Sequence, residues 1–133
     1  MSRKLILSVF GTLFFIASLM AQTPIELLET AAKYYSENDF EKAIKVLEEG
    51  RKIHASDGNI LLLLSNAYIA AEKLDVAKDA FKEGVIQEPE NKFYRYNYGS
   101  LLLNAEEYPE AEVQLKKAIE IDPTNDDYFL QAG

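Results

Sequence analysis

A pattern that recurs every 34 residues constrains the fold of this chain more than any other feature of its sequence. The segment YPEAEVQLKKAIEIDP occupies residues 108–123, and its apolar residues recur at spacings of three and four, which indicates one face of a helix. Segments with the same pattern begin 34 and 68 residues earlier, at Leu74 and Phe40. A fixed period of this length, with residues of matched size at several offsets, predicts an array of stacked helical repeats.

Capping residues place the helices that precede and connect these segments. Thr23-Pro24-Ile25-Glu26 is a capping box with proline in the first turn, and it predicts a helix from Pro24 to about Glu37. The other expected helices run from Phe40 to about His54, Ile60 to about Lys73, Leu74 to Pro89, Lys92 to Glu106, and Tyr108 to Pro123.

Two aspartates and one glycine lead to predictions about where helices begin and end. We expect Asp39 and Asp75 to cap the helices that follow them, because a short carboxylate can accept hydrogen bonds from the first backbone N–H groups. Residues 56–59, with the sequence SDGN, predict a turn, in which Gly58 is free to adopt positive φ.

The first 21 residues have the layout of a secretory signal peptide. Arg3 and Lys4 precede an almost wholly apolar run, and Ala21 is a small residue at a plausible cleavage point before Gln22. The alternative is an uncleaved membrane anchor, although the apolar run is short compared with the ~20 residues that cross a bilayer. In both cases we expect the remainder to be exported to the periplasm or the cell envelope.

Charge and composition exclude several classes of function. The formal net charge is −8, which disfavours binding to nucleic acid or to anionic lipid, because both depend on cationic side chains. The chain has no cysteine, so it can form neither disulfides nor thiolate metal sites. Packing alone must stabilise the fold, which suits stacked helices.

The 34-residue pattern resembles the tetratricopeptide repeat. The last complete copy presents the residues that the family favours at Tyr98, Gly99, Leu102, Tyr108, Ala111, Leu115, Ala118 and Pro123. It departs from the family at Arg95, where a tryptophan is preferred. The resemblance implies an all-α fold, a right-handed superhelix of antiparallel helix pairs (an α-solenoid), preceded by the signal-peptide helix.

The resemblance also divides the chain. After the leader at 1–21, it implies repeats at 24–57, 58–91 and 92–125, followed by residues 126–133 as the start of a truncated fourth repeat. Repeat arrays normally end in a polar capping helix. We therefore expect either that the chain is a fragment of a longer protein, or that this stub pairs with another element.

Small residues of the pattern predict close contacts between helices. Gly99 is expected to meet Ala111 where the two helices of a repeat cross. Gly50 and Gly84 lie inside helices, where each costs about 1 kcal/mol relative to alanine. That cost is understandable if they admit the first helix of the next repeat.

The first helix of each tetratricopeptide repeat lines a concave groove, and the resemblance therefore implies a binding surface. The residues expected to contact a ligand there are Leu28, Tyr35, Asn59, Leu62, Asn66, Phe93, Tyr96, Asn97, Ser100 and Asn104. Some family members grip a peptide's terminal carboxylate with cations, but Leu28, Phe93 and Asn97 occupy those positions here. The expected ligand is instead an apolar extended segment or an amphipathic helix.

No residue pattern in the sequence indicates catalysis. His54 is the only histidine and lies near a helix end, where a cation is favoured, and no phosphate-binding glycine loop is present. We expect no enzyme activity, no cofactor, no metal and no small-molecule substrate. The expected partner is a protein or peptide, with membrane contact only through an uncleaved N-terminal segment.

Two functions follow from this reading. The first is a non-enzymatic, exported scaffold for protein–protein interaction, with a role in assembling complexes of the bacterial envelope. The alternative is the periplasmic docking or sensing front end of a longer signalling receptor or envelope enzyme, of which this chain is a fragment.

Overall fold

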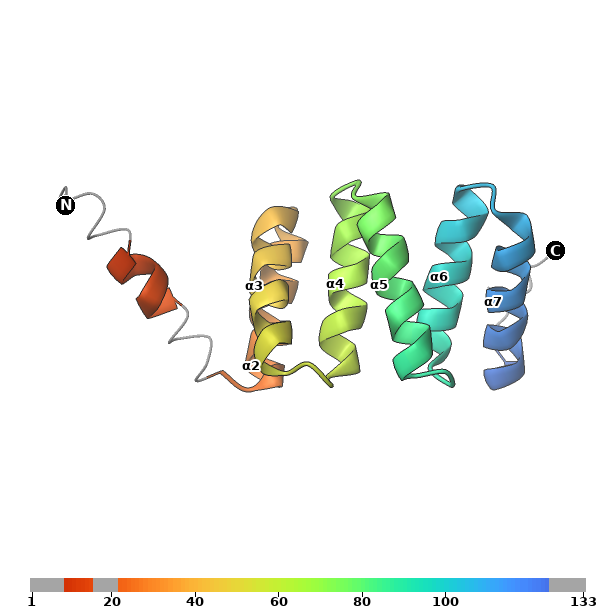
Figure 1. Ribbon diagram of the computed structural model, residues 1–133, viewed down its shortest axis with the longest axis horizontal. Helices are drawn as coiled ribbons and strands as arrows, with labels where there is room; N and C mark the ends of the chain where they lie inside the picture. The colour runs from red at the N-terminus through yellow and green to blue at the C-terminus, as the bar shows by residue number, and fades with distance from the viewer. Residues whose placement is uncertain (1–8, 16–21, 125–133) are drawn as a thin grey trace. The chain divides into compact units, whose positions relative to one another are not determined.

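The computed structural model of the chain describes residues 9–15 and 22–124, which form helices and short turns (Figure 1). Residues 9–15 are helical. The helices that follow are α2 (Pro24–Ser36), α3 (Phe40–Ile53), α4 (Gly58–Ala70), α5 (Leu74–Gln87), α6 (Lys92–Asn104) and α7 (Tyr108–Ile121). No strand occurs in these ranges, and the predicted all-α class is confirmed.

The chain divides into two compact units, which we call the N-terminal unit (Met1–Ile60) and the C-terminal unit (Leu61–Gly133). The division falls inside α4, so the first three residues of that helix belong to the N-terminal unit. Several sequence predictions concern residues outside the described ranges. They are the leader at 1–8 and 16–21, and the truncated fourth repeat at 126–133. None of the helices that the structure describes is long and apolar enough to cross a membrane.

In the N-terminal unit, α2 packs against α3 through a seam of small and aliphatic side chains. Leu27 and Ala31 of α2, and Ala43 and Leu47 of α3, have no exposed surface. A Cβ atom added at Gly50 would overlap the side chain of Leu27. Gly50 therefore gives room to Leu27 of its own helix pair, and that it also admits the first helix of the next repeat stays a prediction.

In the C-terminal unit, α6 packs against both α5 and α7. The rings of Phe81 and Tyr98 stack with centroids 6.2 Å apart. The prediction for Gly84 is confirmed, because an added Cβ would overlap the buried ring of Tyr94 at the start of the next helix pair. The close crossing predicted at Gly99 is also confirmed, although the nearest side chain is that of Leu115, with Cγ 2.7 Å from an added Cβ.

The turns inside the three helix pairs share one conformation that repeats with the sequence period. Asn38, Glu72 and Glu106 have φ values of 59°, 60° and 61°. After Glu106, the backbone N–H of Glu107 donates to the carbonyl of Leu102, and the N–H of Glu106 donates to Leu103. This is a Schellman motif, which satisfies the last carbonyls of a helix and normally favours glycine at the positive-φ residue.

The structure confirms some of the predicted caps and corrects others. The Thr23 capping box forms in full, and Asp39 accepts a hydrogen bond of 3.3 Å from the N–H of Lys42. Asp75 was expected to cap α5, but the N-cap residue is Lys73 and Asp75 lies within the first helical turn. α5 begins at Leu74, ahead of Asp75, because the Schellman turn at Glu72 returns the chain to helical geometry within two residues.

The turn expected at residues 56–59 was also placed wrongly. Gly58 is the first residue of α4, and no glycine in the described ranges has positive φ. Asp57 acts as the cap, since its Oδ1 accepts hydrogen bonds from the N–H groups of Asn59 (2.9 Å) and Ile60 (3.2 Å). With Asp57 as the cap, α4 starts two residues before the predicted Ile60.

Candidate functional site

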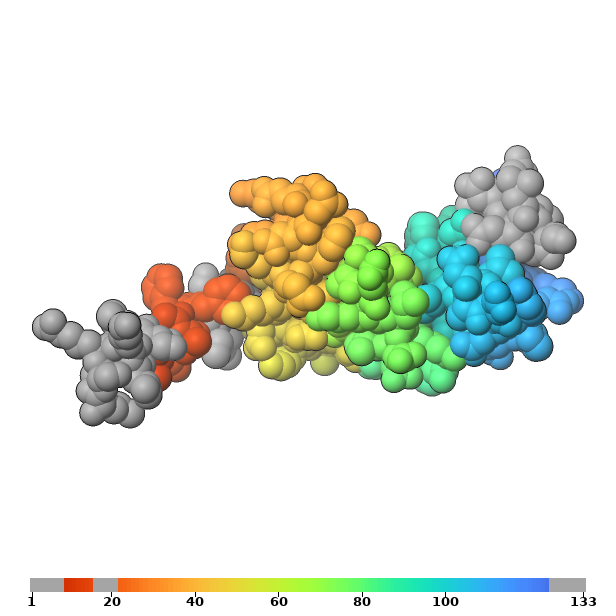
Figure 2. All heavy atoms as spheres, turned by 90° about the horizontal axis from the view of Figure 1, so that it is seen from above, coloured from red at the N-terminus to blue at the C-terminus, as the bar shows by residue number. Residues whose placement is uncertain are grey.

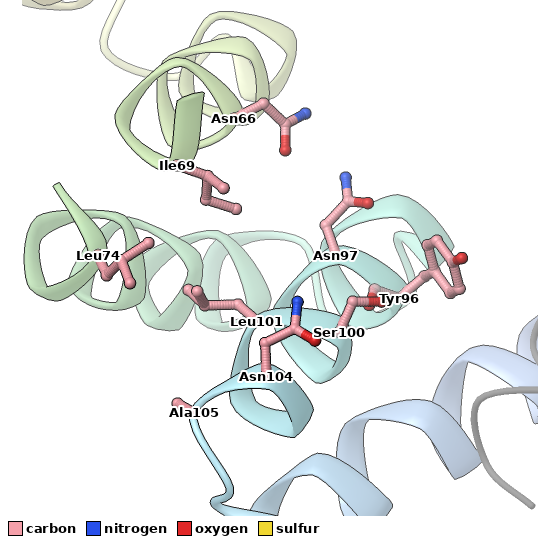
Figure 3. A pocket seen from close by; sticks show the side chains of 9 residues that line it. All are labelled: Asn66, Ile69, Leu74, Tyr96, Asn97, Ser100, Leu101, Asn104 and Ala105. Carbon is pink, nitrogen blue, oxygen red and sulfur yellow. The ribbon is translucent and has the colours of Figure 1, made fainter. Parts of the chain in front are cut away.

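The C-terminal unit contains a pocket of about 450 Å³ between α4, the start of α5 and the exposed side of α6 (Figure 3). Its lining consists of Asn66, Ile69, Leu74, Tyr96, Asn97, Ser100, Leu101, Asn104 and Ala105. No charged side chain lines it. We call it the asparagine pocket.

Three amide side chains give this pocket its polar character. Asn97 and Asn104 are seven residues apart on α6, which places them on the same side of the helix, and Asn66 faces Asn97 from α4 (Figure 3). Asn66 and Asn97 are half-buried, and Asn104 is exposed. In the part of the chain that the structure describes, none of the three amides has a hydrogen-bond partner. Each therefore presents a donor and an acceptor to a ligand.

Aliphatic side chains form the other part of the lining. Ile69 of α4 and Leu74 of α5 lie near Leu101 of α6 at one side of the pocket (Figure 3). Leu101 is buried and Leu74 is half exposed, at 50%. An apolar ligand group placed on this side would cover Leu74, which the chain itself leaves in contact with water.

Two tyrosines on α6 have different environments. The ring of Tyr96 points outward at the edge of the pocket, away from the apolar side (Figure 3). Tyr98 is buried against Phe81, and this burial raises the pKa of its hydroxyl to about 12, with the nearby carboxylate of Glu110 acting in the same direction. Tyr98 is thus a neutral core residue, and only Tyr96 is placed to touch a ligand.

The structure brings together half of the residues predicted to contact a ligand. Asn66, Tyr96, Asn97, Ser100 and Asn104 all line the asparagine pocket. The Ser100 hydroxyl donates to the Tyr96 carbonyl at 2.9 Å. That these residues bind a ligand stays a prediction.

The other predicted residues lie elsewhere. Phe93 lines a separate depression with the α5–α6 turn and Ile121, and Leu62 is half-buried on α4 outside the pocket lining. Leu28, Tyr35 and Asn59 belong to the N-terminal unit. There, the ring of Tyr35 packs edge-on against Phe40, with centroids 5.2 Å apart.

Four lining residues were not among those predicted to contact a ligand: Ile69, Leu74, Leu101 and Ala105. Leu74 was assigned only to the pattern of helix starts, and Leu101 lies outside the groove positions that the family resemblance supplied. A signal was nevertheless present, because Leu74 is a large apolar residue beside a turn, a position that packing inside the pair does not bury.

The ion pairs of the C-terminal unit lie outside the pocket lining. Lys92 pairs with Asp122 at 2.6 Å, Lys117 with Glu90 at 3.3 Å, and Lys78 with Glu107. Residues 9–15 and 22–124 contain no group of three or more histidine, aspartate or glutamate side chains placed to hold a metal ion. The chemistry that the pocket offers is therefore neutral hydrogen bonding beside an apolar surface.

Comparison with known proteins identifies relatives in sequence. Two sequence models of the tetratricopeptide repeat match residues 34–92 and 94–125. The TPR repeat-containing protein YpiA of Bacillus subtilis (strain 168) is 31% identical over 104 residues, which is 77% of this chain and 25% of that protein. The chain thus spans about a quarter of the length of the curated relative that it matches.

Comparison with solved structures identifies the fold. The first TPR of Spaghetti (RPAP3) bound to the HSP90 peptide SRMEEVD has a TM-score of 0.77 at 18% identity, covering 81% of this chain and 86% of that one. The Yersinia enterocolitica type III secretion chaperone SycD, in complex with a peptide of the translocator YopD, has a TM-score of 0.71 at 22% identity, covering 79% and 80%. These similarities support the all-α, solenoid-type fold class predicted from the sequence.

Proposed function

Because the chain belongs to the tetratricopeptide repeat family, we propose that it is a non-enzymatic interaction module that binds a peptide segment of a partner protein in the asparagine pocket. One observation carries the proposal. Three amides without partners in the described chain stand beside an apolar surface in a pocket without charges.

This arrangement suits the backbone of an extended peptide. Such a backbone presents N–H donors and C=O acceptors in alternation, and an asparagine side chain can pair with both. Asn66 and Asn97 face each other and would hold the backbone from two sides, while Ile69, Leu74 and Leu101 would receive one apolar side chain. Main-chain hydrogen bonds then supply affinity, and the apolar anchor supplies selectivity.

Peptide ligands are known for proteins of similar fold. The RPAP3 structure contains the HSP90 peptide SRMEEVD, and the SycD structure contains a peptide of YopD. These precedents support a peptide as the ligand class. They do not carry over the ligand itself, because the asparagine pocket has no cation to receive a carboxylate. We expect SRMEEVD not to bind this chain.

A defined peptide library tests the proposal. Hexapeptides would carry fluorescein at the N-terminus and an amide at the C-terminus, so that neither end is charged by the peptide itself. They would be screened against the full chain by fluorescence polarisation. We expect members with a central leucine, isoleucine or phenylalanine to bind, and the double variant Asn66→Ala/Asn97→Ala to weaken them at least tenfold, since each lost hydrogen bond is worth about 0.5–1.5 kcal/mol.

A matched control separates binding from folding. Gln87 is an exposed amide on α5, outside the pocket lining, where it donates to Glu83 at 2.7 Å. Gln87→Ala should leave peptide affinity unchanged, and circular dichroism should show the helical content of all variants to be equal. Absence of binding by every peptide, or equal loss in the control, would show that the pocket is not a peptide site.

We place this module outside the cytoplasm, on the strength of the basic start and apolar run of residues 1–21. Its role there would be to hold components of an envelope complex together. Mass spectrometry of the chain recovered from a bacterial host would test export, with a mature N-terminus at Gln22 as the expected result. A cytoplasmic product that retains Met1 to Ala21 would contradict it.

A further inference from the structure

We propose that the bound segment carries a positive charge, a lysine or arginine side chain, next to its apolar anchor. Two turns, at residues 71–73 and 105–107, border one end of the asparagine pocket, and the charge would face this end. The inference rests on the proposed function and specifies the chemistry of the ligand for the same pocket.

The two turns lie at one end of the pocket. Leu74, which follows the first turn, and Ala105, which begins the second, both line the pocket. In Figure 1 the α4–α5 and α6–α7 turns are at the same end of the C-terminal unit, and Figure 2 looks onto that end. Glu72 and Glu106 are the exposed positive-φ residues of these turns.

The charge at this end is negative and only partly compensated. In the described ranges, no ion-pair or hydrogen-bond partner is found for the carboxylates of Glu72, Asp75 and Glu106. Lys73 adds one positive charge among these three acids, and Lys78 is already paired with Glu107. Because the pocket lining itself is neutral, these acids set the sign of the potential that a ligand meets there.

The opposite end of the same helices differs. There, Lys92 is paired with Asp122, and Lys117 lies within ion-pair distance of both Glu90 and Glu120. Glu90, Glu120 and Asp122 are thus each within ion-pair distance of a lysine, whereas the three acids beside the turns have no such partner in the described ranges. A cationic group of the ligand is therefore expected beside the turns, so that an elongated ligand with one charged end would bind in one orientation.

Backbone geometry supports a role for the two glutamates. Glu72 and Glu106 both adopt the left-handed conformation, which costs a residue with a side chain about 1–2 kcal/mol and favours glycine or asparagine. In the N-terminal unit the equivalent residue is Asn38, which tolerates this conformation. The chain thus keeps two disfavoured residues with the same charge at the two turns that border the pocket.

The test compares peptides that differ only in charge. From the hexapeptide screen, the tightest capped binder with an apolar centre would be resynthesised with lysine, glutamine or glutamate at each flanking position. We expect the best lysine peptide to bind about two- to tenfold tighter than its glutamine counterpart in 50 mM NaCl. The advantage should shrink in 0.5 M NaCl, because salt screens exposed charges.

Two double variants locate the effect. Glu72→Gln/Glu106→Gln should remove the preference for lysine and leave the affinity for the glutamine peptide unchanged. Glu90→Gln/Glu120→Gln removes the same charge from the opposite end of the helices and should preserve the preference.

The outcomes separate this inference from the proposed function. If glutamine and glutamate peptides bind as tightly as lysine peptides, the proposed function stands and the charge preference is refuted. If the preference persists in Glu72→Gln/Glu106→Gln, its assignment to these turns is refuted. If no capped peptide binds at all, both proposals fall.

Discussion

Arg95 and Gln114 are joined by a hydrogen bond of 2.8 Å from the guanidinium Nη1 to the side-chain Oε1. The Gln114 amide in turn donates to Glu110 at 2.6 Å, and Arg95 Nε donates to the carbonyl of Pro89 at 3.0 Å. Gln114 is almost fully buried, with 4% of its surface exposed. Arg95 thus ties the α5–α6 turn to α7, at a position where the family prefers a tryptophan.

Arg95→Ala should lower the free energy of unfolding by about 1–3 kcal/mol, because it leaves a buried acceptor on Gln114 without its donor. Urea denaturation followed by circular dichroism would measure the loss. Lys82→Ala, an exposed cation on α5, is the control and should change stability by no more than about 0.5 kcal/mol. Equal effects of the two substitutions would show that the Arg95 network contributes nothing.

Gly84→Ala should destabilise the C-terminal unit although alanine favours helix. A Cβ at this position would overlap the ring of Tyr94, which is fully buried and has no space to move into. Overpacking of this kind costs about 1–3 kcal/mol, against a gain of up to about 1 kcal/mol in helix propensity. We expect a net loss of about 1–2 kcal/mol in thermal or urea unfolding.

A second substitution tests the cause of that loss. In Gly84→Ala/Tyr94→Leu the smaller side chain gives the new methyl group room, so the cost of the double variant should be less than the sum of the two single costs by at least about 0.5 kcal/mol. Additive costs, or a Gly84→Ala variant more stable than the parent, would show that the contact between α5 and α6 is not tight at this point.

Glu106→Gly should stabilise the chain. The residue has a φ of 61°, and its turn already makes both hydrogen bonds of the Schellman motif, so glycine would relieve the strain without changing the fold. The expected gain is about 0.5–1 kcal/mol after the greater flexibility of glycine in the unfolded chain is subtracted. Glu106→Val, which is β-branched, should act in the opposite direction. A loss of stability with glycine would refute this account of the turn.

The sequence predicted those parts of the fold that depend on neighbouring residues. The capping box of Thr23 needs only Glu26, three residues away, and it forms as expected. The roles predicted for Asp75 as a cap and for Gly58 as a turn residue were wrong, because the competing interactions were not visible in the repeat pattern. The positive φ of Glu72 lets α5 begin at Leu74, before Asp75. The Asp57 side chain caps α4, which therefore begins at Gly58.

The candidate site was predicted only in part, because the sequence pattern locates residues within a repeat but does not show how the helices pack. Asn66, Asn97 and Asn104 belong to groove positions of a known repeat, so the resemblance located them. Leu74 reaches the pocket from the start of α5 and Ala105 from the C-terminal end of α6, and only the packing of α4, α5 and α6 brings them together. Phe93 was grouped with them by its repeat position, but it sits in a different depression, beside Ile121.

Asp122 connects the stability of the C-terminal unit to acid pH. Hydrogen bonds from the Lys92 ammonium and from the Thr124 side chain and backbone lower the pKa of this carboxyl from 3.8 to about 2. A carboxyl whose pKa is lower in the folded state stabilises the fold above its unfolded pKa, and this contribution is lost as the pH falls towards the folded value. The loss is therefore expected between about pH 4 and pH 2.

Asp122→Asn should accordingly be less stable than the parent at pH 6, and the two should converge near pH 2, where the parent's carboxyl is also becoming neutral. Urea denaturation at a series of pH values would measure the difference. Lys92→Gln removes the largest cause of the pKa shift and should reproduce most of this pH dependence, so that combining both substitutions adds little to either alone. A stability difference that stays constant from pH 6 to pH 2 would mean that the Lys92–Asp122 pair does not persist in solution.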